Sequence, residues 1–384
     1  MMSKRLWYVA LGNLGKPFIA ATIHCREDVR GLRRCGWDAT LYSQADQPIS
    51  TPEGVKESVV CKNRPLIYRL IFELAMCLKL LSRAKPDFVM MRGTRLVLFT
   101  LALRLTGVPY GLELCGPPQC FLGKGGFLGN WGDRYLIRHA AVFICLTREL
   151  EELVLPLKRP DAAVAVTGVG VNSETYQVAR SQTPNTFEGP VLGFLGTLYA
   201  DRGLGCLIDG VAELDRLGVK AKLLVVGDGP YRAQAEQKAK DMNLGDRIVF
   251  KGWVCPDKVA DALAECDLTV ALYEREIALT VGGINPMKVW TSLAVGKPIL
   301  LYNPGKFDAY ASVPGIFVCP QARPAEVAEL VAQTWSRLGR KGLAQAGIAG
   351  RKYVEQNVTW LSHAQVIDRT IRQAIHTECR RNSE

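Results

Sequence analysis

The stretch KLLVVGDGPYRAQAEQKAKDMNL, residues 222–244, decides the fold. It opens with an apolar run, 222–226, that has the length of a buried strand. Gly-Asp-Gly-Pro follows, and its glycines predict a tight turn, because glycine adopts backbone conformations that other residues avoid. Residues 231–243 then show helical spacing. A strand that turns at once into a helix is the repeating unit of a parallel sheet covered by helices.

The same unit recurs on both sides of this stretch. Buried strands are predicted at 6–11, 38–42, 88–91, 110–114, 142–146, 163–167, 191–195, 222–226, 247–250, 268–272 and 298–301. Helices are predicted at 19–35, 68–84, 95–106, 204–217, 231–243, 258–266, 286–295 and 361–375. The polar stretch 173–190 has neither pattern and is the expected linker. We therefore predict an α/β chain of two Rossmann-like, doubly wound domains that face a cleft.

Composition and charge narrow the class of protein. With 384 residues, 48% hydrophobic and 22% charged, the chain is globular and large enough for two domains. The net charge is +11, and residues 1–183 hold 24 Lys and Arg against 15 Asp and Glu. This excess favours phosphates or an anionic membrane surface as partners, with simple surface solubility as the alternative. Basic runs with interleaved aromatic residues do not occur, so no nucleic-acid partner is expected.

Membrane spans and metal sites are not expected either. No apolar run approaches the about 18 residues that cross a bilayer. The twelve cysteines are scattered singly, and we interpret them as reduced thiols of a cytosolic protein. The four histidines show no metal-ligand spacing, so we predict no metal ligand.

A sharply bounded helix is predicted within GGINPMKVWTSLAVGKP, residues 282–298. Asn285 is a good N-cap, and Pro286 suits the first helical position. Gly296 suits the position just past the last turn. The start of such a helix presents free N–H groups and a partial positive charge, which attract anions. The alternative is an ordinary capped helix with no ligand.

The order of several segments resembles that of the retaining group 1 glycosyltransferases, the family 4 type, which have the GT-B fold. The segments are VLGFLGTLYADRGLGCLIDGV (191–211), the Gly-Asp-Gly-Pro unit, RIVFKGWV (247–254), CDLTVALY (266–273) and NPMKVWTSLAVGKPILLYN (285–303). In the first half, KPDFVMMRG (85–93), FICLTRELEE (143–152) and VTGVGVN (166–172) fit more loosely. The resemblance implies an acceptor-binding domain at 1–180, a nucleotide-sugar-binding domain at 181–360, and a C-terminal helix at 361–384 that packs back on the N-terminal domain.

The resemblance also implies which residues meet the substrates. The donor carries a diphosphate whose charge grows as the glycosidic bond breaks, and cations stabilise that charge. The expected catalytic residues are Arg202 and Lys288. Glu113 and Cys115 are expected on the acceptor side. The other expected donor-binding residues are Gly12, Gly15, Thr197, Gly227, Trp253, Val254, Gly282, Gly283, Asn285, Met287 and Thr291.

Four of these positions depart from the pattern of the family. Its members usually carry an arginine at the position of Thr197 and a histidine at the position of Cys115. They often carry glutamates at the positions of Gly283 and Thr291. A threonine hydroxyl bonds a ribose hydroxyl more weakly than a carboxylate does, so a changed donor affinity or donor identity is expected.

The sequence thus predicts a metal-independent glycosyltransferase. It would move a sugar, with retained configuration, from a nucleotide-sugar to a glycan or lipid-linked acceptor in bacterial surface polysaccharide biosynthesis. No cofactor is expected beyond the nucleotide-sugar co-substrate. We expect a cytoplasmic protein that associates peripherally with the inner face of the cell membrane through an exposed, glycine-rich and aromatic loop at 120–135. The alternatives are a non-catalytic binding or scaffold subunit of the same fold and a sugar-nucleotide epimerase.

Overall fold

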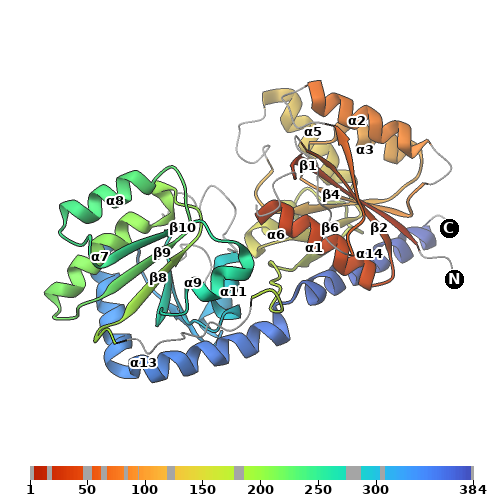
Figure 1. Ribbon diagram of the computed structural model, residues 1–384. Helices are drawn as coiled ribbons and strands as arrows, with labels where there is room; N and C mark the ends of the chain where they lie inside the picture. The colour runs from red at the N-terminus through yellow and green to blue at the C-terminus, as the bar shows by residue number, and fades with distance from the viewer. Residues whose placement is uncertain are drawn as a thin grey trace. The chain divides into compact units, whose positions relative to one another are not determined.

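The computed structural model describes residues 4–14, 20–45, 54–61, 67–81, 85–93, 95–118, 126–176, 186–273, 287–302 and 308–381. These residues form two compact units. The first unit contains the described residues of Met1–Gly170 and Trp360–Glu384, and the second those of Val171–Thr280 and Pro286–Thr359. Each unit has its own parallel sheet with helices packed against it (Figure 1).

The first unit is built on a seven-stranded parallel sheet in the order β3-β2-β1-β4-β5-β6-β7. Its strands are β1 Arg5–Asn13, β2 Asp38–Gln44, β3 Glu57–Cys61, β4 Phe88–Arg92, β5 Tyr110–Leu114, β6 Val142–Cys145 and β7 Ala163–Val166. The central strands are buried on both faces, which explains their continuous apolar runs. The order of the strands reverses between β1 and β4. Open α/β sheets bind ligands beyond the carboxyl ends of the strands at such a switch point.

The helices of the first unit include one from the far end of the chain. They are α1 Ala20–Arg34, α2 Ile67–Leu80, α3 Val97–Leu105, α5 Gly126–His139, α6 Arg148–Val154 and α14 Trp360–Arg381. α14 packs on α1, where a Cβ on Gly31 would lie 2.4 Å from the Cβ of Ala364 (Figure 1). Trp37 Nε1 also donates to Asp368 Oδ1 at 2.6 Å. The predicted return of the C-terminal helix to the N-terminal part of the chain is therefore confirmed.

The second unit repeats the plan with a six-stranded parallel sheet in the order β10-β9-β8-β11-β12-β13. Its strands are β8 Val191–Leu195, β9 Lys222–Val226, β10 Ile248–Gly252, β11 Leu268–Ala271, β12 Ile299–Leu301 and β13 Ile316–Val318. Its helices are η1 Ala200–Arg202, α7 Leu204–Arg216, α8 Arg232–Asp241, η2 Pro256–Lys258, α9 Val259–Ala262, α11 Met287–Ala294, α12 Asp308–Ala311 and α13 Pro324–Asn357. The strand order reverses between β8 and β11, which is the switch point of this sheet.

The end of α11 follows the sequence signals. Gly296 has φ of 76°, and its N–H donates to Leu293 at 2.9 Å, while the N–H of Lys297 reaches back to Ser292 at 2.9 Å. This pair of bonds is a Schellman motif, as the position of the glycine predicts. α13 packs closely here, since a Cβ on Gly347 would lie 2.0 Å from the carbonyl oxygen of Gly296. The predicted N-cap, Asn285, lies outside the described residues.

The structure corrects two expectations about helices. Residues 126–139 form α5, whereas we predict a loop at 120–135, of which 120–125 lie outside the described residues. Glycine lowers helix propensity, but Gly132 lets α5 approach α3: a Cβ there would lie 2.8 Å from Val97 Cγ2. α13 is not predicted at all, and Gly339, with φ of 56°, interrupts its helical pattern. Within the described ranges, none of the helices is both long and apolar enough to cross a membrane.

Candidate active site

The carboxyl ends of β8 and β11 hold two aromatic rings beside the switch point of the second sheet. Phe194 lies in β8, and Tyr273 follows the end of β11 by two residues. Lys288, in the first turn of α11, lies against both: its Nζ is 4.8 Å from the Phe194 ring centroid and 4.5 Å from that of Tyr273. Arg202 Cζ lies 5.8 Å from the same tyrosine centroid. Two cations thus share one aromatic ring where the fold favours a ligand.

The charges of this pair are not balanced. Burial lowers the pKa of Lys288, the charge of Arg202 lowers it further, and the pKa is about 7. Asp201 pairs with Arg202 at 3.4 Å and only partly opposes this shift. Within the described part of the chain, no carboxylate lies within ion-pair distance of the Lys288 ammonium. A bound anion would favour the charged form of Lys288 and be held by it.

Glycines allow the loop that carries Arg202 to lie against its neighbours. Gly227 has φ of 141°, and a Cβ there would lie 1.9 Å from the carbonyl oxygen of Gly196. Gly203 has φ of 78°, and a Cβ there would lie 2.4 Å from the Cβ of Leu272. Only glycine combines these backbone angles with such close approach. Gly227 therefore positions the loop.

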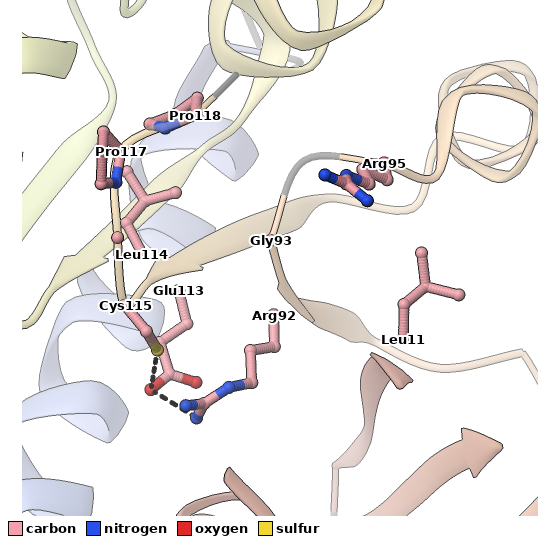
Figure 2. A pocket seen from close by; sticks show the side chains of 10 residues that line it. Leu11, Arg92, Gly93, Arg95, Glu113, Leu114, Cys115, Pro117 and Pro118 are labelled. Atoms are coloured by element: carbon pink, nitrogen blue, oxygen red, sulfur yellow. Dashed lines mark hydrogen bonds and ion pairs between the residues drawn. The ribbon is translucent and has the colours of Figure 1, made fainter. Parts of the chain in front are cut away.

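A pocket of about 330 Å³ occupies the switch point of the first sheet (Figure 2). The residues that line it come from β1, β4, β5 and the turns that follow them; they are Leu11, Arg92, Gly93, Arg95, Glu113, Leu114, Cys115, Gly116, Pro117 and Pro118. Glu113 and Cys115, both predicted for the acceptor, meet here, and the thiol donates to Glu113 Oε1 at 3.7 Å. Cys115 is exposed at this pocket.

Comparison with known families decides the class of enzyme. The model of "Glycosyl transferases group 1" matches residues 189–337, and that of the "Glycosyl transferase 4-like domain" matches residues 20–170. Together they cover most of the chain. The chain belongs to the group 1 glycosyltransferases. The family expected from the order of the sequence motifs is thus confirmed.

Relatives and solved structures agree with this assignment. The chain is 27% identical to a 2-deoxystreptamine glucosyltransferase of Streptomyces kanamyceticus (67% of this chain, 69% of the relative). It is 24% identical to a lipopolysaccharide 1,2-N-acetylglucosaminetransferase of Salmonella typhimurium (54% and 55%) and to a GDP-mannose-dependent phosphatidylinositol monomannoside mannosyltransferase of Mycobacterium tuberculosis (52% and 54%). Sucrose-phosphate synthase of Thermosynechococcus elongatus superposes with TM-score 0.76 at 14% identity (97% and 100%). Anabaena HepE in complex with UDP superposes with TM-score 0.73 at 16% identity (96% and 99%). These structures confirm the GT-B fold.

The donor-binding residues predicted for this glycosyltransferase have different surroundings. Thr197 is exposed in the loop between β8 and η1, and Trp253 is 56% exposed directly after β10. Val254 and Met287 are half-buried. Thr291 is buried in α11, and its side chain lies near the Tyr176 hydroxyl.

One predicted donor-binding residue lies in a strand, and four others lie outside the described residues. Gly12 lies in the last part of β1, in the irregular stretch between Val9 and Asn13, whereas we predict it in a loop after the strand. The remaining four lie outside the described residues: Gly15, Gly282, Gly283 and Asn285.

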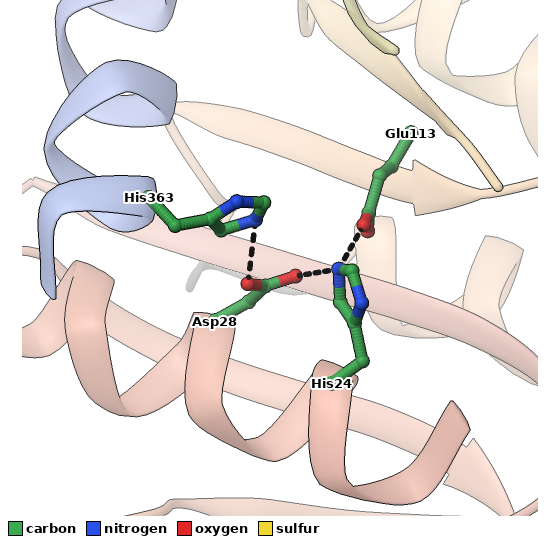
Figure 3. A group of neighbouring side chains, drawn as sticks. All are labelled: His24, Asp28, Glu113 and His363. Carbon is green, nitrogen blue, oxygen red and sulfur yellow. Dashed lines mark ion pairs between the residues drawn. The ribbon is translucent and has the colours of Figure 1, made fainter. Parts of the chain in front are cut away.

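A buried polar cluster beneath the pocket was not predicted (Figure 3). His24 and Asp28 come from α1, Glu113 from β5 and His363 from α14. His24 Nε2 lies 2.5 Å from Glu113 Oε1 and 3.2 Å from Asp28 Oδ2, and His363 Nε2 lies 3.0 Å from Asp28 Oδ1. Tyr8 Oη donates within the cluster, to Asp28 at 3.0 Å or to Glu113. One atom from each of the four ligand-type side chains lies within 4.8 Å of the others, near enough to surround one metal ion.

Charge within this cluster is balanced by protons and by Arg92. Burial lowers the pKa of His24, but Asp28 and Glu113 outweigh burial and raise it to about 9. Burial raises the pKa of Asp28, but His24 and His363 outweigh it and hold that pKa far below its usual range. Glu113 also pairs with Arg92 Nη1 at 3.5 Å. His24 and Arg92 as cations therefore offset the two carboxylates, and our prediction of no metal ligand stays a prediction.

Some of the site residues that were not predicted carry a signal in the sequence, and others do not. Arg92 could have been found, because it is a charged residue at the end of an otherwise apolar strand and next to a glycine. Tyr273 also lies two residues after a buried strand. His24, Asp28 and His363 carry no such signal, because only the packing of α14 on α1 brings them together.

Proposed function

We propose that this glycosyltransferase transfers a sugar from a nucleotide-sugar to a glycan or lipid-linked acceptor in bacterial surface polysaccharide assembly, with retention of configuration. One observation carries the proposal: Arg202 and Lys288 share the Tyr273 ring at the switch point of the second sheet. A diphosphate there meets a guanidinium fork and an ammonium group at once. The named acceptors of two relatives, lipopolysaccharide and a phosphatidylinositol mannoside, support the acceptor class.

The two cations would act chiefly on the leaving group. As the bond between the sugar and the diphosphate breaks, negative charge accumulates on the phosphate oxygens. The Lys288 ammonium, held in a poorly solvated position, and Arg202 would stabilise this charge more strongly than water does. These fixed cations supply the stabilisation that a divalent metal gives in other enzymes, so we propose a metal-independent reaction without a cofactor. Retention is proposed from the family resemblance.

A donor panel tests this function. We expect turnover with one of the UDP-, GDP- or ADP-sugars, and we expect Arg202→Ala to lower it about a hundredfold, because one stabilising group of the leaving phosphate is lost. Arg216→Ala is the matched control: its exposed side chain lies at the opposite end of α7, about 20 Å away along the helix. NMR of the anomeric proton of the product tests retention. Nucleotide binding without turnover on any acceptor would instead favour the non-catalytic subunit, and sugar isomers formed without acceptor would favour the epimerase.

We also propose that the enzyme works at the inner face of the cell membrane and touches it through α2 and α3. This α2–α3 face consists of nine exposed apolar side chains, 37–89% accessible: Ile67, Leu70, Ile71, Leu74, Leu78, Leu81, Leu98, Leu101 and Leu105. Spacings of three, four and seven residues place them in one stripe on each helix. Exposed apolar surface of this extent is unusual in a monomeric protein and is typical of a membrane or protein contact.

Charges beside the α2–α3 face favour an anionic bilayer as its partner. Arg69, Lys79, Arg95 and Arg104 lie in or next to the two helices. Glu73, the acidic residue of α2, is buried and accepts the N–H groups of Leu98 and Phe99 at the start of α3. Because Glu73 also pairs with Arg69 at 3.5 Å, the positive charge beside this face comes chiefly from Lys79, Arg95 and Arg104, which suits anionic lipid headgroups.

Sedimentation with phosphatidylglycerol vesicles tests the α2–α3 face. We expect the wild type to bind, more weakly as salt increases, and Leu74→Glu/Leu78→Glu to lower the partition coefficient at least tenfold. Leu217→Glu, an equally exposed leucine of the second unit, is the matched control and should bind like the wild type. Equal binding of the α2 variant and the wild type would contradict this docking surface.

A further inference from the structure

The pocket of the first unit resembles the donor site of the second unit in its position and charge. It lies at the ends of β1, β4 and β5, beside the point where the order of the first sheet reverses, and Lys288 lies between β8 and β11, where the second sheet reverses. Its lining also contains two cations, Arg92 and Arg95. At each switch point, a position where this kind of sheet binds ligands therefore carries two basic side chains.

Arg92 is fixed in place from below. It is the last residue of β4, and its side chain is 17% exposed. Glu113 Oε1 accepts from its Nη1 at 3.5 Å (Figure 2). Glu113 is itself held by His24 and Tyr8. A guanidinium has five N–H donors, and this long bond uses one of them. The buried cluster thus positions a guanidinium at the pocket with donors to spare.

Arg95 is exposed at the rim of the same pocket. Its carbonyl accepts a hydrogen bond from Arg69 Nη2, which ties the rim to α2. In the part of the chain that the structure describes, no carboxylate lies within ion-pair distance of its guanidinium. The positive charge of Arg95 is therefore available to a ligand.

Counting the charges at and below the pocket leaves an excess of positive charge. Arg92, Arg95 and protonated His24 face Asp28 and Glu113, so one positive charge is not offset. Arginine forks match the oxygen atoms of a phosphate, and both arginines line this pocket. A phosphate monoester carries about two negative charges and gains more from this site than a singly charged carboxylate.

We propose that this pocket, which Arg92 and Arg95 line, binds a phosphate group of the acceptor. That this phosphate belongs to the acceptor rests on the proposed function. That the pocket binds a phosphate does not. The acceptor is then a phosphate-bearing molecule, either a soluble sugar phosphate or a lipid whose phosphate lies at the bilayer surface. A lipid phosphate is favoured, because Arg95 lies two residues before α3, which carries part of the α2–α3 face.

The test measures binding in the absence of turnover. Because the donor site also attracts phosphate, the parent protein is Arg202→Ala/Lys288→Ala, and glucose 6-phosphate, glucose, glucuronate and dioctanoyl phosphatidate are titrated calorimetrically. We expect a phosphate ligand to bind, glucuronate to bind more weakly and glucose not at all. Adding Arg95→Ala should weaken phosphate binding about tenfold, Arg92→Lys should retain part of it, and Arg34→Ala, an exposed arginine of α1, should change nothing.

Each outcome distinguishes one case. Tighter binding of dioctanoyl phosphatidate than of glucose 6-phosphate assigns a lipid phosphate, and the reverse order assigns a soluble one; both support the proposal. If neither phosphate binds the parent, or Arg95→Ala binds as tightly as the parent, the proposal is wrong. The donor panel with the wild type is independent of this binding test. Failed turnover with intact phosphate binding would overturn the proposed function, and the phosphate site would still be supported.

Discussion

Lys288→Met is expected to lower kcat/KM about a thousandfold while the protein remains folded. The ammonium lies between two aromatic rings in poorly solvated surroundings, where its attraction for a phosphate is stronger than in water. Methionine has a similar volume and fills the same space without the charge. Steady-state kinetics with the donor identified by the panel, together with circular dichroism, measure the two parts of this expectation.

The pH profile gives a second measure of the same residue. With a pKa of about 7 in the free enzyme, Lys288 is charged below pH 7 and neutral above it. Because kcat/KM reports the free enzyme, it should be highest below pH 7 and fall up to tenfold per pH unit above it. Lys288→Arg remains charged at all these pH values, so its profile should stay flat through pH 9.

Lys240→Met provides the control, because Lys240 is an exposed lysine in the last turn of α8. Its kinetics should match those of the wild type at every pH. A Lys288→Met enzyme with wild-type kcat/KM would show that the diphosphate lies elsewhere. A wild-type profile that is flat from pH 6 to 9 would contradict the lowered pKa but not the contact.

The second unit shows how far local patterns can predict a fold and a site. β9, the turn at Gly227 and α8 follow from apolar runs and glycine positions, which depend on neighbours in the sequence. Arg202 and Lys288 are adjacent to such signals, and the structure places both at one tyrosine ring. Thr291 shows the limit: its position in α11 is predictable, but the hydroxyl of Tyr176 that it meets comes from a distant segment.

The first unit contains features that no local pattern could reveal. α5 carries several glycines and forms a helix because packing against α3 outweighs the low propensity of glycine. The cluster of His24, Asp28, Glu113 and His363 forms only when two tertiary arrangements are present together. α14 must return to α1, and β5 must end beside both. Neither fact is encoded in the spacing of these residues.

Asp28→Ala is expected to lower the free energy of unfolding by about 3–5 kcal/mol, because removing one partner of a buried ion pair leaves uncompensated charge. Asp28 lies between His24 and His363, and all three side chains are almost fully buried. The same loss should loosen α14 from α1, since Asp28 pairs with His363 across the two helices. Glu213→Gln, which breaks the exposed pair with Arg216, is the control and should change stability by less than about 1 kcal/mol.

The cluster also predicts how stability depends on pH. The pKa of His24 is about 9 in the folded protein and about 6.5 when unfolded, so its contribution is complete below pH 6.5 and disappears as pH rises through 9. A difference of this size corresponds to about 3 kcal/mol. Asp28 and Glu113 have lowered pKa values, so their contribution is complete above about pH 4.5 and disappears as pH falls. The charged or titratable groups that act on or contact His24 are Asp28, Glu113, Arg92 and His363.

Urea unfolding at intervals from pH 4 to 9.5 separates these contributions. The wild type should be most stable between about pH 4.5 and 6.5 and lose stability toward pH 9. In His24→Gln the decline above pH 6.5 should largely vanish, because glutamine cannot titrate, while the acid limb remains. A His24→Gln curve that falls as steeply as that of the wild type would assign the alkaline loss to other groups. Unchanged stability of Asp28→Ala would mean that the Asp28 carboxylate adds no net stabilisation to the packing of α14.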